Sequence, residues 1–141
     1  MSSTAPLFSP RQLSILLAED DADLRFILSH SLVRGGYAVD EVSNREDMDE
    51  KISTLKETVP GQRRLDVIVS DIQLSDGSVL PVLFRHRDFI SRFPTILITS
   101  DKSPEVLRKA RQLGIYDVLG KPFDLPFLFA TISHSIMVQQ N

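Results

Sequence analysis

The chain has 141 residues, of which 42% are hydrophobic and 25% are charged, and these values are typical of a single globular domain. A formal net charge of −3 offers no basic surface for DNA or RNA, so direct nucleic-acid binding is not expected. The absence of cysteine excludes disulfides and thiolate metal sites, and it favours the cytoplasm. No run of about 18 apolar residues is present, so no membrane span is predicted.

Residues 1–12 are expected to form a short loose arm, because small residues, serine and proline dominate them, and residues 13–141 are expected to form the domain. Within the domain, five short apolar runs alternate with longer segments of helical periodicity. This alternation is typical of βα units on a parallel sheet. The predicted strands are residues 13–18, 38–42, 67–70, 95–99 and 117–119.

Helices are expected between these strands. Apolar residues from Leu24 to Leu32 share one helical face, and a glycine pair ends that helix at residue 35. Residues 44–58 are charged with three apolar positions, which predicts a largely solvated helix, and residues 58–65 predict a surface loop.

Three further helices are predicted after the third strand. One is expected over residues 78–92, with Pro81 in its first turn. Another follows Ser103 as N-cap and Pro104 at the first helical position, and it ends at Gly114. The last follows Asp124, and its apolar residues again recur at helical spacing.

Polar residues follow the predicted strands at their carboxyl ends. Glu19 and Asp20 follow the first strand, Asp71 the third, Thr99 the fourth and Lys121 the fifth. Because the carboxyl ends of parallel strands share one edge of a sheet, these side chains can meet there. Clustered carboxylates repel one another unless a cation lies among them, and oxygen ligands suit Mg²⁺. A carboxylate nucleophile, a lysine and a hydroxyl then predict phosphoryl transfer to aspartate.

Each of these residues also has a simpler interpretation. An acidic cluster such as residues 19–23 is common at a helix N-terminus. Asp71 alone fits a strand-end turn, Lys121 a solvated loop cation, and Thr99 a hydroxyl that satisfies backbone groups. The coincidence of four strand ends favours a functional site over these separate interpretations.

Other polar residues are assigned no chemistry. The basic cluster of residues 85–87 with Arg92 predicts a solvated helix face. None of the histidines, which are His30, His86 and His134, has a metal-ligand partner at helical spacing.

The order and spacing of the strand-end residues resemble the receiver domains of response regulators from residue 13 to about residue 138. ILLAEDDADLR resembles the family's first strand with its acidic pair, and DVIVSDIQLSDGS resembles the third strand with its phosphoacceptor. PTILITS resembles the strand that carries a switch hydroxyl, and DVLGKPF resembles the segment that carries the phosphate-binding lysine.

This resemblance implies an α/β fold, a doubly wound five-stranded parallel sheet of flavodoxin-like order 2-1-3-4-5 with helices on both faces. It also implies a phosphoacceptor at Asp71, a switch hydroxyl at Thr99 and a phosphate-binding Lys121 joined to Pro122 by a cis peptide bond. The implied Mg²⁺ ligands are Glu19, Asp20, Asp71 and the backbone carbonyl of Gln73.

The function implied is a signalling switch rather than an enzyme. A histidine kinase or histidine phosphotransfer protein would donate the phosphoryl group to Asp71, and the modified domain would change its binding to a downstream protein. No DNA-binding or enzymatic module follows the domain, so a single-domain regulator or phosphorelay component is expected unless the chain is part of a longer protein.

Several positions depart from the family's commonest pattern. Glu19 replaces the more frequent aspartate, and Ser75 and Val79 replace the usual proline and glycine, which predicts a less rigid loop. Val118 stands at the switch aromatic position, and Tyr116 comes two residues too early. These departures leave open a receiver-like interaction module that works without phosphate. A dehalogenase-type phosphatase is disfavoured, because AED stands where that class has its Asp-x-Asp nucleophile motif.

The last predicted helix has no charged residue from position 125 to position 141. An uncharged outer face indicates a surface that another protein covers. We hypothesise that this helix, the helix after Ser103 and the strand at residues 117–119 form a homodimer or partner interface. The outer face is expected to present Phe127, Thr131, Ser133, His134, Met137, Val138 and glutamines.

Overall fold

All five expected strands pair in parallel in the computed structural model, which describes residues 12–57, 59 and 64–140. The strand order β2-β1-β3-β6-β7 confirms the predicted order 2-1-3-4-5. Residues 1–11 of the expected arm and residues 58 and 60–63 of the expected surface loop lie outside the described residues. The strands are β1 (Ser14–Ala18), β2 (Ala38–Val42), β3 (Val67–Asp71), β6 (Thr95–Thr99) and β7 (Asp117–Gly120).

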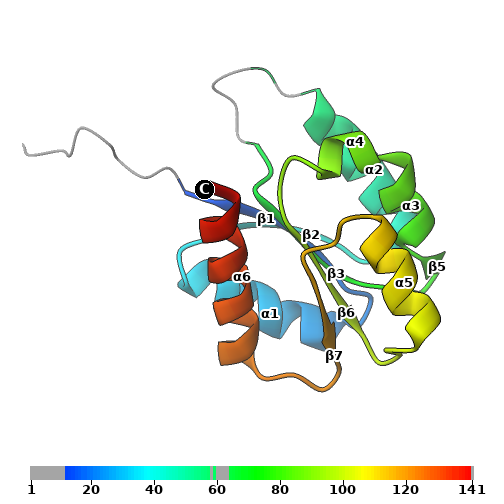
Figure 1. Ribbon diagram of the computed structural model, residues 1–141. Helices are drawn as coiled ribbons and strands as arrows, with labels where there is room; N and C mark the ends of the chain where they lie inside the picture. The colour runs from blue at the N-terminus through cyan, green and yellow to red at the C-terminus, as the bar shows by residue number, and fades with distance from the viewer. Residues whose placement is uncertain (1–11, 58, 60–63, 141) are drawn as a thin grey trace, which may run out of the picture.

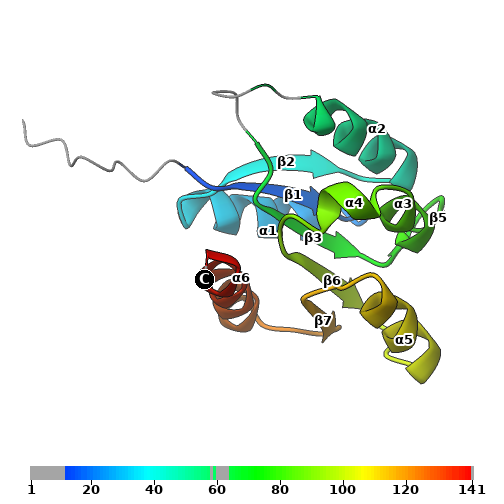
Figure 2. The same ribbon diagram turned by 45° about the horizontal axis from the view of Figure 1, so that its top comes forward.

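Helices cover both faces of this sheet and enclose two apolar cores (Figures 1 and 2). Successive strand residues point to opposite faces. Leu16 and Leu97 therefore pack in one core, whereas Leu17 and Ile98 pack in the other. The first core contains residues of α2 (Arg45–Lys56), α3 (Leu80–Arg85), α4 (Arg87–Ile90) and α5 (Pro104–Gln112). The second core contains residues of α1 (Ala22–Arg34) and α6 (Leu125–Gln140).

Short polar side chains begin the helices beside the carboxyl edge of the sheet. Asp21 accepts hydrogen bonds from two backbone N–H groups in the first turn of α1, at 2.9 and 3.1 Å. Asn44 accepts one at 2.7 Å in α2, and Ser103 caps α5, with Pro104 in the first turn as predicted. These caps satisfy N–H groups that a helix start leaves without partners, and they fix where each strand-end loop stops.

The prediction of a single helix over residues 78–92 is wrong. Ser78 lies in the short strand β5 (Gly77–Ser78), which pairs antiparallel with β4 (Gln73–Leu74), and Gly77 has a φ of 130°. The remainder divides into α3 and α4 at His86, whose backbone has φ −103° and ψ 20°. The ring of His86 is buried and turns toward α2. Apolar spacing does not predict a hairpin or a buried histidine, which explains the error.

The outer face of α6 is uncharged as predicted, and the predicted residues up to position 139 are exposed on it with one exception. Phe127, Met137 and Val138 are 54%, 63% and 50% exposed. Thr131 is buried instead of exposed, and its hydroxyl donates to the Phe127 carbonyl. Neither α6, with 16 residues, nor any other helix of the described ranges has the length and apolarity of a membrane span.

Candidate functional site

Three carboxylates meet at the carboxyl ends of β1 and β3. Glu19 directly follows β1 and Asp71 ends β3, and both side chains are buried, whereas Asp20 is exposed. The two strands are neighbours in register, with Ala18 opposite Ser70. This register brings one carboxylate oxygen from each acidic residue within 4.8 Å of the others.

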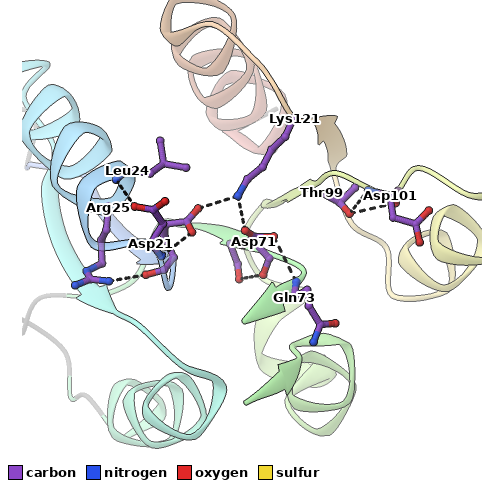
Figure 3. Close-up of polar contacts among 10 residues, drawn as sticks. Asp21, Leu24, Arg25, Asp71, Gln73, Thr99, Asp101 and Lys121 are labelled. Atoms are coloured by element: carbon purple, nitrogen blue, oxygen red, sulfur yellow. Dashed lines mark hydrogen bonds and ion pairs between the residues drawn. The ribbon is translucent and has the colours of Figure 1, made fainter. Parts of the chain in front are cut away.

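Lys121, which follows β7, bridges the two buried carboxylates (Figure 3). Its Nζ donates to Asp71 Oδ2 at 2.6 Å and to Glu19 Oε1 at 3.3 Å. The peptide bond between Lys121 and Pro122 is cis, as the resemblance implies. The ammonium group therefore offsets part of the negative charge that two strands concentrate at this edge.

The pKa values of Glu19 and Lys121 are both raised, but for different reasons. For Glu19, loss of water around the carboxyl is the largest effect and raises the pKa, and the nearby charge of Asp71 adds to it. For Lys121, burial lowers the pKa, but the hydrogen bond and charge of Asp71 together with the charge of Glu19 outweigh burial. At neutral pH Lys121 is a cation, and Glu19 protonates more easily than an exposed glutamate.

Two other predicted site residues, Thr99 and Gln73, make their hydrogen bonds with or through backbone groups. Thr99 is buried at the end of β6, and its hydroxyl donates to the Asp101 carbonyl at 3.1 Å and accepts from the Asp101 N–H at 2.9 Å (Figure 3). The backbone N–H of Gln73 donates to Asp71 Oδ1 at 3.4 Å, and the Gln73 side chain is exposed. The Thr99 hydroxyl thus bonds to backbone groups, as expected if Thr99 simply satisfies hydrogen bonds at the end of its strand.

Val118 and Tyr116 contribute to different cores. Val118 is half-buried and packs in the core of α2 to α5, at the position where the family usually has an aromatic residue. Tyr116 packs in the core of α1 and α6, and its hydroxyl hydrogen-bonds to the His134 ring. Tyr116 therefore does not replace the aromatic side chain missing at position 118.

The donors at the strand ends are of one chemical kind, because Glu19, Asp20 and Asp71 all offer carboxylate oxygens. Hard divalent cations such as Mg²⁺ bind oxygen donors and usually take one or two carboxylates. The residues present therefore fit a hard divalent cation at this edge of the sheet.

A family model described as "Response regulator receiver domain" matches residues 15–133. The chain belongs to this family. The matched range contains the ends of β1 and β3, which carry the carboxylates, and the lysine after β7. The whole cluster therefore lies within the receiver domain.

The receiver is similar to regulators that are longer than itself. It is 30% identical over 123 residues to the DNA-binding transcriptional regulator NtrC of Rhizobium meliloti (strain 1021), which covers 87% of this chain and 24% of NtrC. It is 35% identical over 121 residues to the transcriptional regulatory protein GltR of Pseudomonas aeruginosa, which covers 84% of this chain and 47% of GltR. The chain thus spans about a quarter to a half of these relatives.

A solved structure with similar sequence and fold is a two-component response regulator from Clostridium difficile. Its TM-score is 0.77 at 26% sequence identity, and the superposition covers 92% of this chain and 99% of that one. Nearly all of that solved chain therefore superposes on the fold described above.

Sequence reasoning missed the acidic residue that anchors the loop after Asp71. The Asp76 carboxylate accepts hydrogen bonds from the backbone N–H groups of Arg45 and Glu46 at 2.8 and 3.1 Å. The first of these bonds is the largest cause of the lowered pKa of Asp76. The hairpin that carries Ser75 is therefore tied to the start of α2, in a loop without the family's usual proline.

The interpretation of His86 as part of a solvated basic face is wrong. His86 Nε2 lies 2.6 Å from Asp49 Oδ1, and the neighbouring Arg85 donates to Asp49 Oδ2 at 2.6 Å. Asp49 belongs to α2, so this cluster joins α2 to the division between α3 and α4. The hydrogen bond with His86 is the largest favourable effect on the charged form, and the pKa of Asp49 is lowered.

We expect Asp49→Asn to destabilise the receiver by about 1–3 kcal/mol at neutral pH, because a buried histidine loses its charged partner. Since folding lowers the pKa of Asp49, its contribution is present above the ordinary value of 3.8 and is lost as the pH falls through the folded-state value. Urea unfolding of wild type and variant across this range measures the effect. The exposed Asp88→Asn is the matched control, and an Asp49→Asn deficit that persists unchanged in acid would contradict this explanation.

Proposed function

We propose that this receiver is a cytoplasmic signalling switch that accepts a phosphoryl group on Asp71 from a histidine kinase or histidine phosphotransfer protein. The observation that carries the proposal is the contact of Lys121 Nζ with Asp71 Oδ2 at 2.6 Å, beside two further carboxylates. An Asp71 oxygen would attack phosphorus and form an acyl phosphate, and the donor nitrogen would leave with its bonding electrons. Lys121 would then balance the charge of the phosphoryl oxygens.

The proposed metal is Mg²⁺, with Glu19, Asp20, Asp71 and the Gln73 carbonyl as its protein ligands. Bound there, the cation would neutralise negative charge at the phosphoryl oxygens. The chain's own part is to hold Glu19 and Asp71 at neighbouring strand ends, where their mutual repulsion favours a cation. Proteins usually bind Mg²⁺ through a few carboxylates together with water and phosphoryl oxygens, and not through a complete cage of protein ligands. The carboxylates at these strand ends agree with that pattern.

Thr99 is the proposed switch residue. Its hydroxyl now bonds to the backbone of Asp101, in the loop that leads into α5. We infer that a phosphoryl group on Asp71 draws this hydroxyl toward itself and releases Asp101. The modification would thereby shift an existing equilibrium of the loop and of the neighbouring surface.

The proposed output surface consists of α5, β7 and the uncharged outer face of α6. The exposed Phe127, Met137 and Val138 make the α6 part suitable for burial against another protein. A second copy of the chain or a downstream protein would bind this surface, and we propose no direct contact with nucleic acid or membrane.

Intact-mass measurement of the wild-type protein after incubation with acetyl phosphate tests the proposed reaction. We expect the mass gain of one phosphoryl group with Mg²⁺, little gain without it, and loss of the group with hydroxylamine, which cleaves acyl phosphates. No gain in protein that circular dichroism shows to be folded would contradict the proposal. That result would favour the interaction module that works without phosphate, and the outer face of α6 would then be tested first for partners.

A further inference from the structure

The loop between β1 and α1 contains both Glu19 and Asp20, and a side chain of α1 holds it. Arg25 Nη1 donates to the backbone carbonyl of Glu19 at 2.8 Å (Figure 3). This carbonyl belongs to the peptide unit that joins Glu19 to Asp20. The direction of that peptide unit therefore affects where both carboxylates point.

Arg25 is itself fixed by β2. Its Nε lies 3.5 Å from Glu41 Oε1, and Glu41 Oε2 accepts a hydrogen bond from Ser29 at 2.9 Å. Arg25 and Ser29 lie four residues apart and so share one face of α1. The planar guanidinium group can contact a carbonyl and a carboxylate at once, which a lysine ammonium does less well. The Arg25 side chain is only 23% exposed, which limits the competition from water.

The two acidic residues depend on this contact to different degrees. The Glu19 N–H donates to the Val42 carbonyl at 3.1 Å, and its carboxylate contacts the Asp21 N–H and Lys121. The Asp20 carboxylate is exposed and has no hydrogen-bond partner among the residues that the structure describes. The position of Asp20 is therefore set by its backbone, and Arg25 holds the preceding carbonyl of that backbone.

We propose that Arg25 is a positioning residue that orients Glu19 and Asp20 for Mg²⁺, an inference that rests on the proposed metal site. A positioning role predicts a change in Mg²⁺ affinity opposite in sign to the change that charge alone predicts. Removing a positive charge near a cation site should tighten Mg²⁺ binding by Coulomb's law. If Arg25 positions the ligands, removing it weakens Mg²⁺ binding in spite of the more favourable charge.

Calorimetric titration of the full chain with Mg²⁺ alone, without a phosphodonor, distinguishes these two effects. We expect Arg25→Met to raise the Mg²⁺ dissociation constant about tenfold, the lower end of the effect of residues that orient metal ligands. Arg34→Met is the matched control, because it removes an exposed arginine from the other end of α1 and should leave Mg²⁺ binding unchanged or slightly tighter. Arg25→Lys, which keeps the charge but not the two-sided contact, should lie between wild type and Arg25→Met.

Urea unfolding without Mg²⁺ measures whether the substitution destabilises the fold. If Arg25 only stabilises the fold, Arg25→Met lowers the free energy of unfolding but does not raise the Mg²⁺ dissociation constant of the folded protein. If Arg25→Met does not fold, Arg25→Lys decides, and a dissociation constant about threefold above wild type supports positioning. Binding by folded Arg25→Met that equals or exceeds wild type would overturn the inference and leave the metal site intact. Absence of Mg²⁺ binding by wild type at millimolar concentration would instead overturn the proposed metal site, and the inference with it.

Discussion

Asp71→Asn is expected to abolish phosphorylation while the protein stays folded. The amide has nearly the shape of the carboxylate but is not a nucleophile toward phosphorus. The change also removes one of two neighbouring negative charges, and the charge of Asp71 contributes to the raised pKa of Glu19. Relief of this repulsion offsets the lost contact with Lys121, so we expect a stability change of no more than about 1 kcal/mol.

Intact mass after treatment with acetyl phosphate and Mg²⁺ measures this loss. Wild type and the exposed control Asp88→Asn should both gain a phosphoryl group, whereas Asp71→Asn should gain none. Hydroxylamine-sensitive phosphorylation of Asp71→Asn would mean that another carboxylate is the acceptor. Equal urea unfolding midpoints for Asp71→Asn and wild type would exclude unfolding as the cause of the loss.

The strands and their carboxyl ends are the part of this protein that sequence predicts best. The limits of β2 and β6 agree with the predicted residues 38–42 and 95–99, because each apolar run is short and bounded by polar or turn-forming residues. The cluster follows from the same information. Once parallel strands are assigned, Glu19 and Asp71 must lie at one edge, and the register of β1 with β3 brings them together.

Contacts between polar side chains distant in sequence are the part that local patterns do not predict. His86 lies among basic residues, which favours a solvated face, yet its partner Asp49 is 37 residues away. Asp76 is separated by about 30 residues from the start of α2 that it binds. Such pairs depend on how α2 packs against the segment after β3, and periodicity carries no information about that packing.

The orientation of Thr99 shows a different limit. The resemblance implies a switch hydroxyl at Thr99, and Thr99 is the last residue of β6. The residue type and its place in the strand do not determine what this hydroxyl contacts. In this structure the Asp101 backbone supplies both hydrogen-bond partners. A residue type at a strand end therefore predicts which group is near the site, whereas the local loop conformation determines what that group contacts.

Lys121→Met is expected to slow phosphorylation by acetyl phosphate by about 10²-fold, because removal of one preorganised donor to developing negative charge typically has an effect of this size. The lysine is the cation that contacts both buried carboxylates. Methionine keeps most of the length of the side chain but offers neither charge nor N–H donors. The initial rate of mass gain, measured with Mg²⁺ at fixed acetyl phosphate concentration, reports the change.

Lys109→Met is the control for this substitution, because it removes a lysine of equal charge from the exposed surface of α5. A phosphorylation rate that is lowered equally in both variants would mean that total charge, not the contact with Asp71, is responsible. A rate unchanged in Lys121→Met would contradict the assignment of this lysine to the phosphoryl group.

Stability provides a second measure of Lys121 that does not depend on phosphorylation. Without the ammonium group, the pKa of Glu19, already raised by burial, should rise further. A carboxyl whose pKa is raised by folding stabilises the protein below its unfolded-state pKa, and this stabilisation is lost as the pH rises through the folded-state value. The free energy of unfolding should therefore fall more steeply for Lys121→Met than for wild type as the pH rises from mildly acidic to neutral. Mg²⁺ should restore the lost stability at neutral pH, because the cation takes the place of the missing positive charge.

Urea unfolding at mildly acidic and at neutral pH, with and without Mg²⁺, tests this prediction. The same pH dependence of stability in the two proteins would show that Lys121 does not offset the negative charge of the site.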